Sequence, residues 1–419
     1  MLGVIYLILC MLIGKELAGL LLSKKSGYNQ IWLTLTAAFG TGVLIMGWAT
    51  YMTAWAASEA GAAHPLIYAN AVVMSVAVLI VVLLYWKRYH KAGSFKGILE
   101  TGMITEHRLF RKEAVFFGAL LVFLTWIMFY VFFIRDGVLY SGYTVYGDYA
   151  PHTAMMRSFS MGNNFPTQYP HFGGQDVKYH FMFQFFVGNL EFLGLRLDLA
   201  YNAVSVLALL GLLIFLYYMA KRLTGSFAAG VLTVFFFFFR SSLSFFRFVI
   251  EHLNSGDLWT TLRDNTTFIG YTTNENWGLW NFNVYLNQRH LAFGLLIVAI
   301  VLWLFMDWLE AGCSAPETGV RWIKKCIFTK KAWLCVHSET ALLAGMILGL
   351  TSFWNGAAVI GGLLILMGFA VFSDGKLDYL ILAVTAVIFS VLQTKIFIWG
   401  NAVSPSFYWG FLSENKSIT

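Results

Sequence analysis

Long apolar runs separated by short polar stretches restrict the fold of this 419-residue chain more than any other feature. A helix needs about 20 such residues to cross the hydrocarbon core of a bilayer, and most of the runs approach that length. Only 12% of the residues are charged, about half of the usual share in soluble domains. The sequence therefore predicts an all-α, polytopic bundle of about 10–11 transmembrane helices.

The apolar segments give a first map of these helices along the chain. The first segment lacks the basic region and the small-residue cleavage site of a signal peptide, so we expect it to be retained as a helix. The candidate spans are 1–22, 30–56, 66–86, 114–134, 181–195, 199–219, 227–245, 289–308, 339–353, 356–372 and 378–399.

The net charge of +7 comes largely from basic residues that cluster in a few short loops. The most basic loop, 86–113, is expected in the cytoplasm under the positive-inside rule. The next span then leads outward, so the polar loop 135–180 faces the outside. The positive charge is explained by membrane topology, and we expect no nucleic acid partner.

The topology beyond this loop depends on segment 181–195, which is short and contains Glu191. If it is interfacial or re-entrant, the basic segments 221–225 and 321–331 are cytoplasmic and loop 246–288 is external. If it crosses the membrane, these three assignments invert. The positive-inside rule favours the first arrangement.

The external loop 135–180 contains the spacing Asp-x3-His twice, as Asp148/His152 and Asp176/His180. Four-residue spacing on a helix places both side chains on one face. Asp148 could instead cap a helix that begins near Pro151, and either carboxylate could simply be solvated. The two pairs also make a divalent metal a candidate. The four cysteines are scattered without a close pair, which argues against a zinc site or a disulfide framework.

The stretch "HTAMMRSFSMG", which begins at His152, interleaves Met155, Met156 and Phe159 with Arg157. This pattern predicts an amphipathic helix over 153–161 that lies in the membrane interface.

The second external loop, 246–288, combines aromatic rings with asparagines. Trp277 and Trp280 could stack on sugar rings while the amides bind hydroxyls. An interfacial aromatic belt with turn-forming asparagines explains the same residues equally well.

Taken together, an apolar span, a loop with "GD…H…NFP" and the following "YHF" resemble the GT-C superfamily of membrane glycosyltransferases over about 114–300. Protein O-mannosyltransferases and aminoarabinose transferases belong to that group. Asp148 matches its acidic position, 153–161 its amphipathic helix, and Tyr179-His180-Phe181 its approach to the next span. The resemblance divides the chain into N-terminal helices with the basic loop (1–113), a GT-C-like core (114–300) and C-terminal helices (301–419).

The resemblance implies transfer of a sugar from a polyprenyl-phosphate donor to a glycan, lipid or protein acceptor at the external membrane face. Asp148 would be the general base, because an inverting transfer needs a carboxylate to accept the proton of the acceptor hydroxyl. The sequence assigns no definite cofactor, and a divalent metal stays open. The expected location is the cytoplasmic membrane of a prokaryote. The expected substrate-binding residues are His152, Arg157, Asp176, Tyr179, His180, Trp277, Trp280, Arg289 and His290.

Two alternatives belong to other classes of protein. A polysaccharide polymerase or ligase would also act on lipid-linked glycans, but would depend on external arginines rather than on one aspartate. A transporter or flippase would concentrate polar residues near the bilayer midplane. This chain gathers them at one interface, which disfavours transport.

Overall fold

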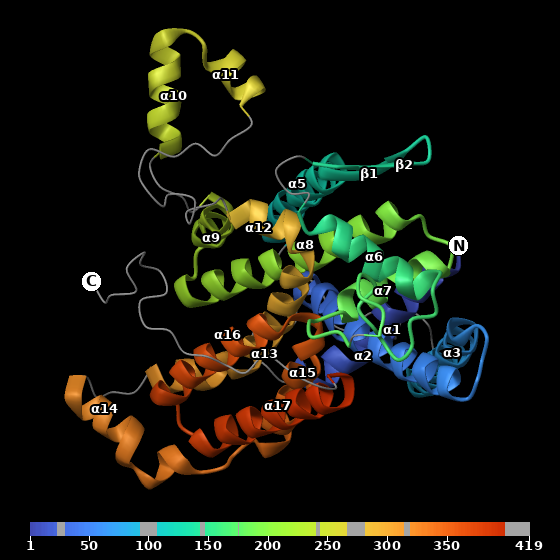
Figure 1. Cartoon of the computed structure of the whole chain (residues 1–419). Helices are drawn as coiled ribbons and strands as arrows, with labels where there is room; N and C mark the ends of the chain where they lie inside the picture. The colour runs from blue at the N-terminus through green and yellow to red at the C-terminus, as the bar shows by residue number, and fades with distance from the viewer. Residues whose placement is uncertain are drawn as a thin grey trace, which may run out of the picture.

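The structure is a computed structural model that describes residues 1–22, 30–92, 107–142, 147–174, 176–239, 244–265, 281–313 and 319–398 (Figure 1). Helices dominate it, and a single short hairpin is found in the described part. The elements are α1 Leu2–Leu22, α2 Ile31–Glu59, α3 Pro65–Ala92, α5 His107–Val131, β1 Phe132–Arg135, β2 Val138–Ser141, α6 Tyr149–Ser160, α7 Met182–Phe192, α8 Leu197–Thr224, α9 Phe227–Phe239, α10 Ser244–Ser255, α11 Leu258–Asp264, α12 Asn281–Asn287, α13 Arg289–Cys313, α14 Gly319–Phe328, η2 Lys330–Trp333, α15 Ser338–Leu350, α16 Ser352–Phe372 and α17 Lys376–Phe397.

Within these ranges, 8 helices are long and apolar enough to cross a membrane by length and composition: α1, α2, α3, α5, α8, α13, α16 and α17. The prediction of a multi-pass helical membrane protein is confirmed at this level. The apolar helices α9 and α15 have 13 residues each and would reach only about 20 Å. Full-length helices in the described part therefore number fewer than the predicted 10–11 spans.

Segment 181–195 does not form a full span. Its helix α7 has 11 residues, so it is about 16 Å long, roughly half of the ~30 Å hydrocarbon core. It packs against α2, α6 and α8, and nine of its residues are buried. This finding agrees with the interfacial or re-entrant alternative for the segment.

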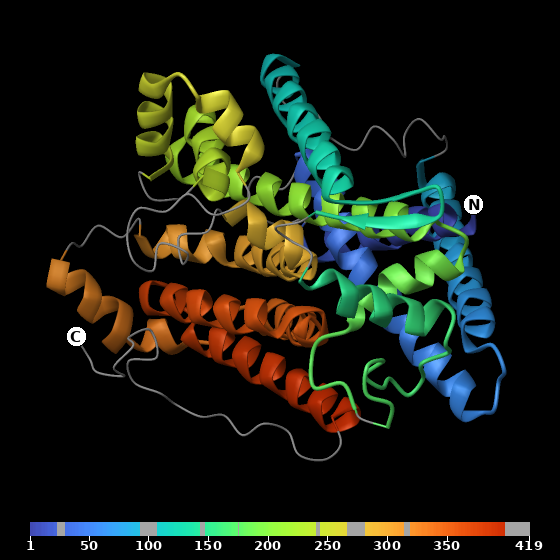
Figure 2. The ribbon, with the colours of Figure 1, turned by 45° about the horizontal axis from the view of Figure 1, so that its top comes forward.

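Polar contacts between helix ends define one end of the bundle, which we call the basic end. Glu113 near the start of α5 accepts hydrogen bonds from Tyr217, Tyr218 and Lys221 near the end of α8. Arg222 on α8 pairs with Glu310 near the end of α13 at 2.6 Å. The long helices α8, α13, α16 and α17 run side by side away from this end (Figure 2).

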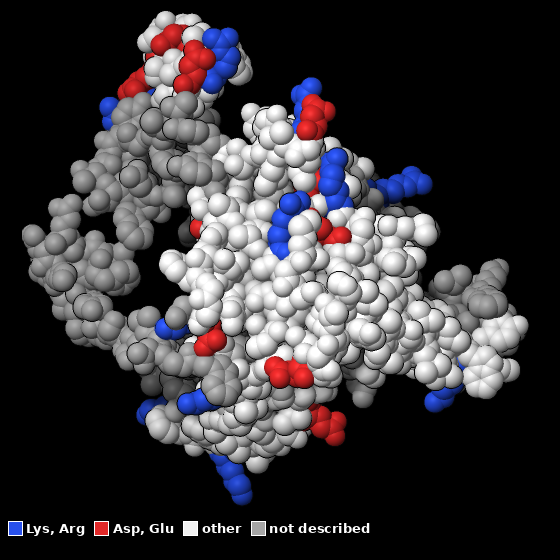
Figure 3. Space-filling model, turned by 45° about the vertical axis from the view of Figure 1, so that its right-hand side comes forward, with Lys and Arg blue, Asp and Glu red and all other residues white. Residues whose placement is uncertain are grey.

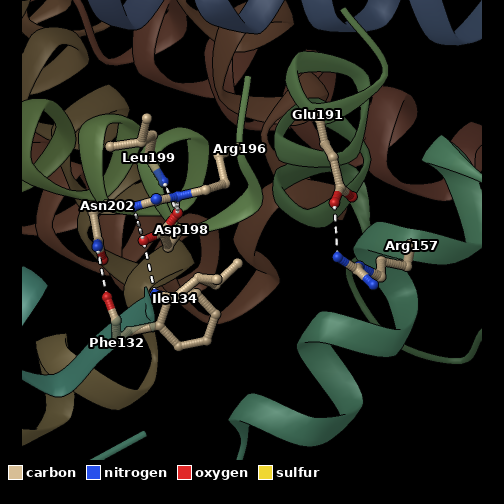
Figure 4. A network of polar contacts seen from close by, with 8 residues as sticks. All are labelled: Phe132, Ile134, Arg157, Glu191, Arg196, Asp198, Leu199 and Asn202. Atoms are coloured by element: carbon tan, nitrogen blue, oxygen red, sulfur yellow. Dashed lines mark hydrogen bonds and ion pairs between the residues drawn. The ribbon is translucent and has the colours of Figure 1, made fainter. Parts of the chain in front are cut away.

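The opposite end, the site end, carries the hairpin β1–β2, which the sequence did not predict. The expected span 114–134 already ends at Val131, and β1 pairs antiparallel with β2 through Phe132 and Ser141. Asp198 at the start of α8 accepts a bond from the Ile134 amide at 2.9 Å and pairs with Arg196 at 2.6 Å (Figure 4). These contacts hold the hairpin against α8.

The turn between α15 and α16 lies inside the bundle. The Trp48 indole on α2 donates a hydrogen bond to the Leu350 carbonyl at 2.8 Å. Asn355 has an extended backbone (φ −164°, ψ 100°), and its side chain accepts a bond from the Ala358 amide at 2.8 Å. Asn355 therefore breaks the helix near its start and caps the part that follows.

The described face of the molecule seen in Figure 3 is largely uncharged. Large apolar side chains are exposed on the outer helices, for example Val122 on α5 at 70% and Met367 on α16 at 63%. Such a surface is stable in contact with lipid, because exposing this much apolar area to water would be unfavourable.

Candidate functional site

A pocket of about 610 Å³ opens at the site end, beside the start of α6. It combines carboxylates, imidazoles and a lysine with aromatic rings. The lining residues are Asp148, Pro151, His152, Met155, Tyr169, Phe172, Asp176, Val177, Lys178, Tyr179, His180 and Gln184. The pocket brings together five of the predicted site residues: Asp148, His152, Asp176, Tyr179 and His180.

Asp148 is held by two amide side chains rather than used as a helix cap. It occupies the N-cap position of α6, but its side chain makes no capping hydrogen bond. Its Oδ2 atom accepts a bond from Asn287 at 2.8 Å and another from Gln288. Its Oδ1 atom has no hydrogen-bond partner within the described ranges. One carboxylate oxygen is thus fixed and the other is available at the pocket.

Arg289 lies behind the pocket and not in its lining. It is 0% exposed, and its guanidinium donates to Tyr149 at 3.1 Å and to the Leu286 carbonyl at 3.1 Å. It also stacks over the Tyr201 ring, 4.4 Å from the centroid. Arg289 was predicted to bind substrate directly. The structure instead places it outside the pocket lining, where it holds Tyr149, the residue next to Asp148.

Three histidines from separate parts of the chain meet beside the pocket: His152 and His180 line it, and His290 lines the adjoining groove. The ring centroid of His290 lies 5.3 Å from that of His152 and 4.0 Å from that of His180. Each ring has a buried nitrogen without a hydrogen-bond partner in the described part: Nδ1 of His152 and His290, and Nε2 of His180. Such nitrogens are costly to bury unless a ligand satisfies them.

Burial keeps the histidines of this cluster neutral. It lowers the pKa of His152 to about 4, against the opposing attraction of the nearby Asp148 carboxylate. Burial and the neighbouring His152 lower the pKa of His180 to about 3. At neutral pH both rings therefore offer one N–H donor and one bare nitrogen.

The two Asp-x3-His spacings have different structures. Asp148 and His152 lie one turn apart at the start of α6, where the His152 amide donates to the Asp148 carbonyl at 3.1 Å. Asp176 and His180 lie outside the helices, and Asp176 forms an isolated β-bridge with Gln168. Among the described residues, no group of three or more His, Cys, Asp or Glu side chains is arranged to hold a metal ion. The divalent metal stays a prediction.

The predicted amphipathic helix exists as α6, but its apolar side faces protein. Met155, Met156 and Phe159 are buried, and α6 packs on α7. Arg157 does not line the pocket: it pairs with Glu191 at 3.3 Å (Figure 4). The structure thus gives Arg157 a partner other than the substrate that we expected.

Two predicted residues, Trp277 and Trp280, lie outside the described residues. Two further residues, Asn287 and Gln288, were not predicted although they contact Asp148 directly. Their signal in the sequence is the polar cluster "NQRH" at the start of a long apolar run, of which only the Arg and His are among the predicted residues.

An apolar groove of about 640 Å³ joins the pocket and shares Lys178, Tyr179 and His180 with it. It runs between α16 and α17, and two of its lining side chains, Ile360 and Val391, are 63% and 49% exposed. Exposed apolar side chains on transmembrane helices face lipid, so the groove opens towards the bilayer.

Comparison of the chain with protein-family models, curated proteins and solved structures gave no match. Its fold defines it as a multi-pass helical membrane protein. Its candidate site is an acidic, histidine-rich pocket at one end of the bundle.

Proposed function

We propose that the chain is a glycosyltransferase that moves a sugar from a polyprenyl-phosphate donor to an acceptor hydroxyl at the external face of the membrane. The observation that supports this proposal is that the polar pocket and the apolar groove adjoin each other. The pocket with Asp148 adjoins the apolar groove through Lys178, Tyr179 and His180. A lipid-linked sugar has the matching chemistry: an apolar chain, then a phosphate, then a polar ring.

The proposed reaction needs a proton acceptor and phosphate-binding groups, and the pocket contains both. The acceptor oxygen attacks the anomeric carbon, the bond from that carbon to the phosphate oxygen breaks, and polyprenyl phosphate leaves with the electron pair. Asp148 accepts the proton of the acceptor hydroxyl through its unbonded oxygen. Lys178 and the N–H groups of the histidines are suited to bind the departing phosphate.

Support for Asp148 as the base comes from its surroundings. General bases must lie within hydrogen-bond reach of the proton that they remove, and Asp148 lines the pocket with one oxygen fixed. Asp176 lines the same pocket. For location, we propose a prokaryotic cytoplasmic membrane with the pocket facing outward.

The test is a lipid-linked-sugar transfer assay on the purified chain. We expect Asp148→Asn to lower the rate by roughly 10²- to 10⁴-fold, because the amide cannot accept the proton. A matched control is Asp136→Asn, since Asp136 lies on the exposed hairpin turn with a φ of 52° that asparagine tolerates well. Retained activity in Asp148→Asn, with Asp136→Asn also active, would overturn the assignment.

A further inference from the structure

A second apolar groove lies between α16 and α17 and extends towards the basic end, and it shares Ile360 and Leu363 with the first groove. It encloses about 630 Å³ between these two helices, Ile327 and Trp333. Its walls are apolar apart from Lys376 and Tyr379. Met367 and Leu380 in the lining are 63% and 55% exposed, so the groove is open on its lipid side.

The amphipathic helix α14 forms one edge of this groove through Ile327. Trp322 stacks on Phe372 at the end of α16, with ring centroids 5.3 Å apart and an interplanar angle of 5°. The Trp333 indole donates a hydrogen bond to the Ile327 carbonyl at 2.7 Å. These contacts fix α14 and η2 against the ends of the long helices.

Basic and apolar side chains alternate on this edge. Val320 and Phe328 on α14 are 67% and 79% exposed. Arg321, Lys324 and Lys330 are exposed, and none of them has an ion pair within the described ranges. A helix with an exposed apolar side and several cations lies in the headgroup region of a membrane.

The side of the membrane follows from the same charges. The basic end gathers most of the described lysines and arginines, and the positive-inside rule places such an end in the cytoplasm. The cytoplasmic leaflet carries anionic lipids, which attract clusters of lysine and arginine near the surface. Charge and apolar shape therefore favour the same occupant.

We propose that this groove is a binding site for an anionic phospholipid of the cytoplasmic leaflet. The acyl chain lies in the groove between α16 and α17 against Trp333. The phosphate binds Arg321, Lys324 and Lys330, which belong to α14 and η2, the two elements that also give the groove Ile327 and Trp333. The proposal does not depend on the transfer reaction, since its phosphate-binding cations lie on α14 and η2, which contribute no residue to the first groove.

Native mass spectrometry of the full chain in detergent tests the site with phosphatidylglycerol and phosphatidylcholine of equal chain length. We expect one phosphatidylglycerol adduct to bind roughly tenfold or more tightly than phosphatidylcholine, because each cation near a lipid surface contributes several-fold. The variant Arg321→Gln/Lys324→Gln/Lys330→Gln is expected to lose this preference. Met367→Trp, which fills the groove, is expected to weaken the adduct of either lipid.

The matched control is Lys87→Gln/Arg111→Gln/Lys112→Gln, which removes three exposed cations at the same end but away from the groove. It should keep the preference for phosphatidylglycerol. Equal binding of the two lipids by the unchanged chain, or an equal loss in both triple variants, would overturn the proposal. Size-exclusion chromatography of each variant confirms that the chain stays folded.

Discussion

At the scale of single residues, the orientation of Asp148 depends on amides that lie about 140 positions away in the sequence. Asn287 and Gln288 both donate to Oδ2 of the carboxylate, and Gln288 also accepts a bond from Tyr179 at 3.4 Å. Without these amides the carboxylate could rotate about its side-chain bonds. The turn between α12 and α13 therefore determines which carboxylate oxygen faces the pocket.

Replacing Asn287 and Gln288 with alanine should slow sugar transfer while leaving the fold intact. We expect a loss of about tenfold to a hundredfold, because small displacements of a reacting group cost rate on that scale. The loss should be smaller than that of Asp148→Asn. Thr53→Ala, on the exposed part of α2, is the control, and unchanged transfer rates in the double variant would show that the amides do not orient the base.

The buried histidines should make the protein sensitive to acid. The folded pKa of His152 is about 4, below its unfolded value near 6.5. The unfolded chain then binds more protons, so stability falls as the pH drops from about 6.5 towards 4. At pH 5 this one residue would lower the free energy of unfolding by about 2 kcal/mol relative to neutral pH.

Thermal unfolding in detergent between pH 7.5 and pH 4.5 measures this effect. His152→Asn is expected to flatten the dependence of Tm on pH, whereas substitution of the exposed His64 by glutamine should leave it unchanged. An equal pH dependence in the His152 variant and the unchanged chain would contradict the prediction.

Sequence patterns identified the residues of the pocket better than they identified their roles. Asp148 and His180 could be predicted because the resemblance depends on local motifs. The roles of Arg157 and Arg289 could not, because their partners Glu191 and Tyr149 lie 34 and 140 positions away. A long cationic side chain reaches several neighbours, and only the folded packing selects one.

At the scale of elements, α1 and α2 cross so closely that only glycine fits at the contact. A Cβ atom added at Gly14 would lie 1.8 Å from the Ala38 carbonyl oxygen, and one at Gly42 would lie 1.8 Å from the Cys10 carbonyl oxygen. Small residues at such crossings let helix backbones approach in a membrane. Thr41 reinforces the crossing with a hydrogen bond to the Gly14 carbonyl at 3.0 Å.

Gly42→Leu should therefore lower the free energy of unfolding by more than the about 1–3 kcal/mol that is typical of overpacking. The atoms in the way belong to the backbone, which cannot move aside as a side chain can. Gly19→Leu is the matched control on α1, because a Cβ there has no neighbour within 4 Å. Thermal unfolding of the two variants compares them. A similar Tm for both would show that the crossing tolerates separation.

Hydropathy predicts long helices well and short elements poorly. A span of 20 apolar residues has one stable form in a bilayer, since each backbone group must be hydrogen-bonded within the segment. The hairpin β1–β2 and the helix α7 are short, and tertiary contacts decide them. The hairpin is anchored by Asp198 and Asn202 on α8, which no local pattern in 132–141 reveals.

At the scale of the whole molecule, the path of the chain places the two ends of the bundle on opposite sides of the membrane. Because α7 is too short to cross, α8 begins at the site end and runs to the basic end. Helix α9 is shorter than a full span, but its end reaches the site end, since Phe237 packs on Tyr285 of α12 with ring centroids 5.1 Å apart. The segment with α10 and α11 follows α9, so it should lie on the same side as the pocket.

Labelling of single cysteines with a membrane-impermeant maleimide in intact cells tests this arrangement, with the four native cysteines replaced by serine. A cysteine at Ser255 on α10 should react without permeabilisation, as should one at Val138 on the exposed hairpin. A cysteine at Ser226, in the turn that follows α8, should react only after permeabilisation. If Ser255 and Val138 differ in accessibility, α9 does not carry the chain back to the site end, and the second loop cannot contribute to the pocket. If all three positions react in intact cells, the basic end is not cytoplasmic, and the anionic lipid site would face the wrong leaflet.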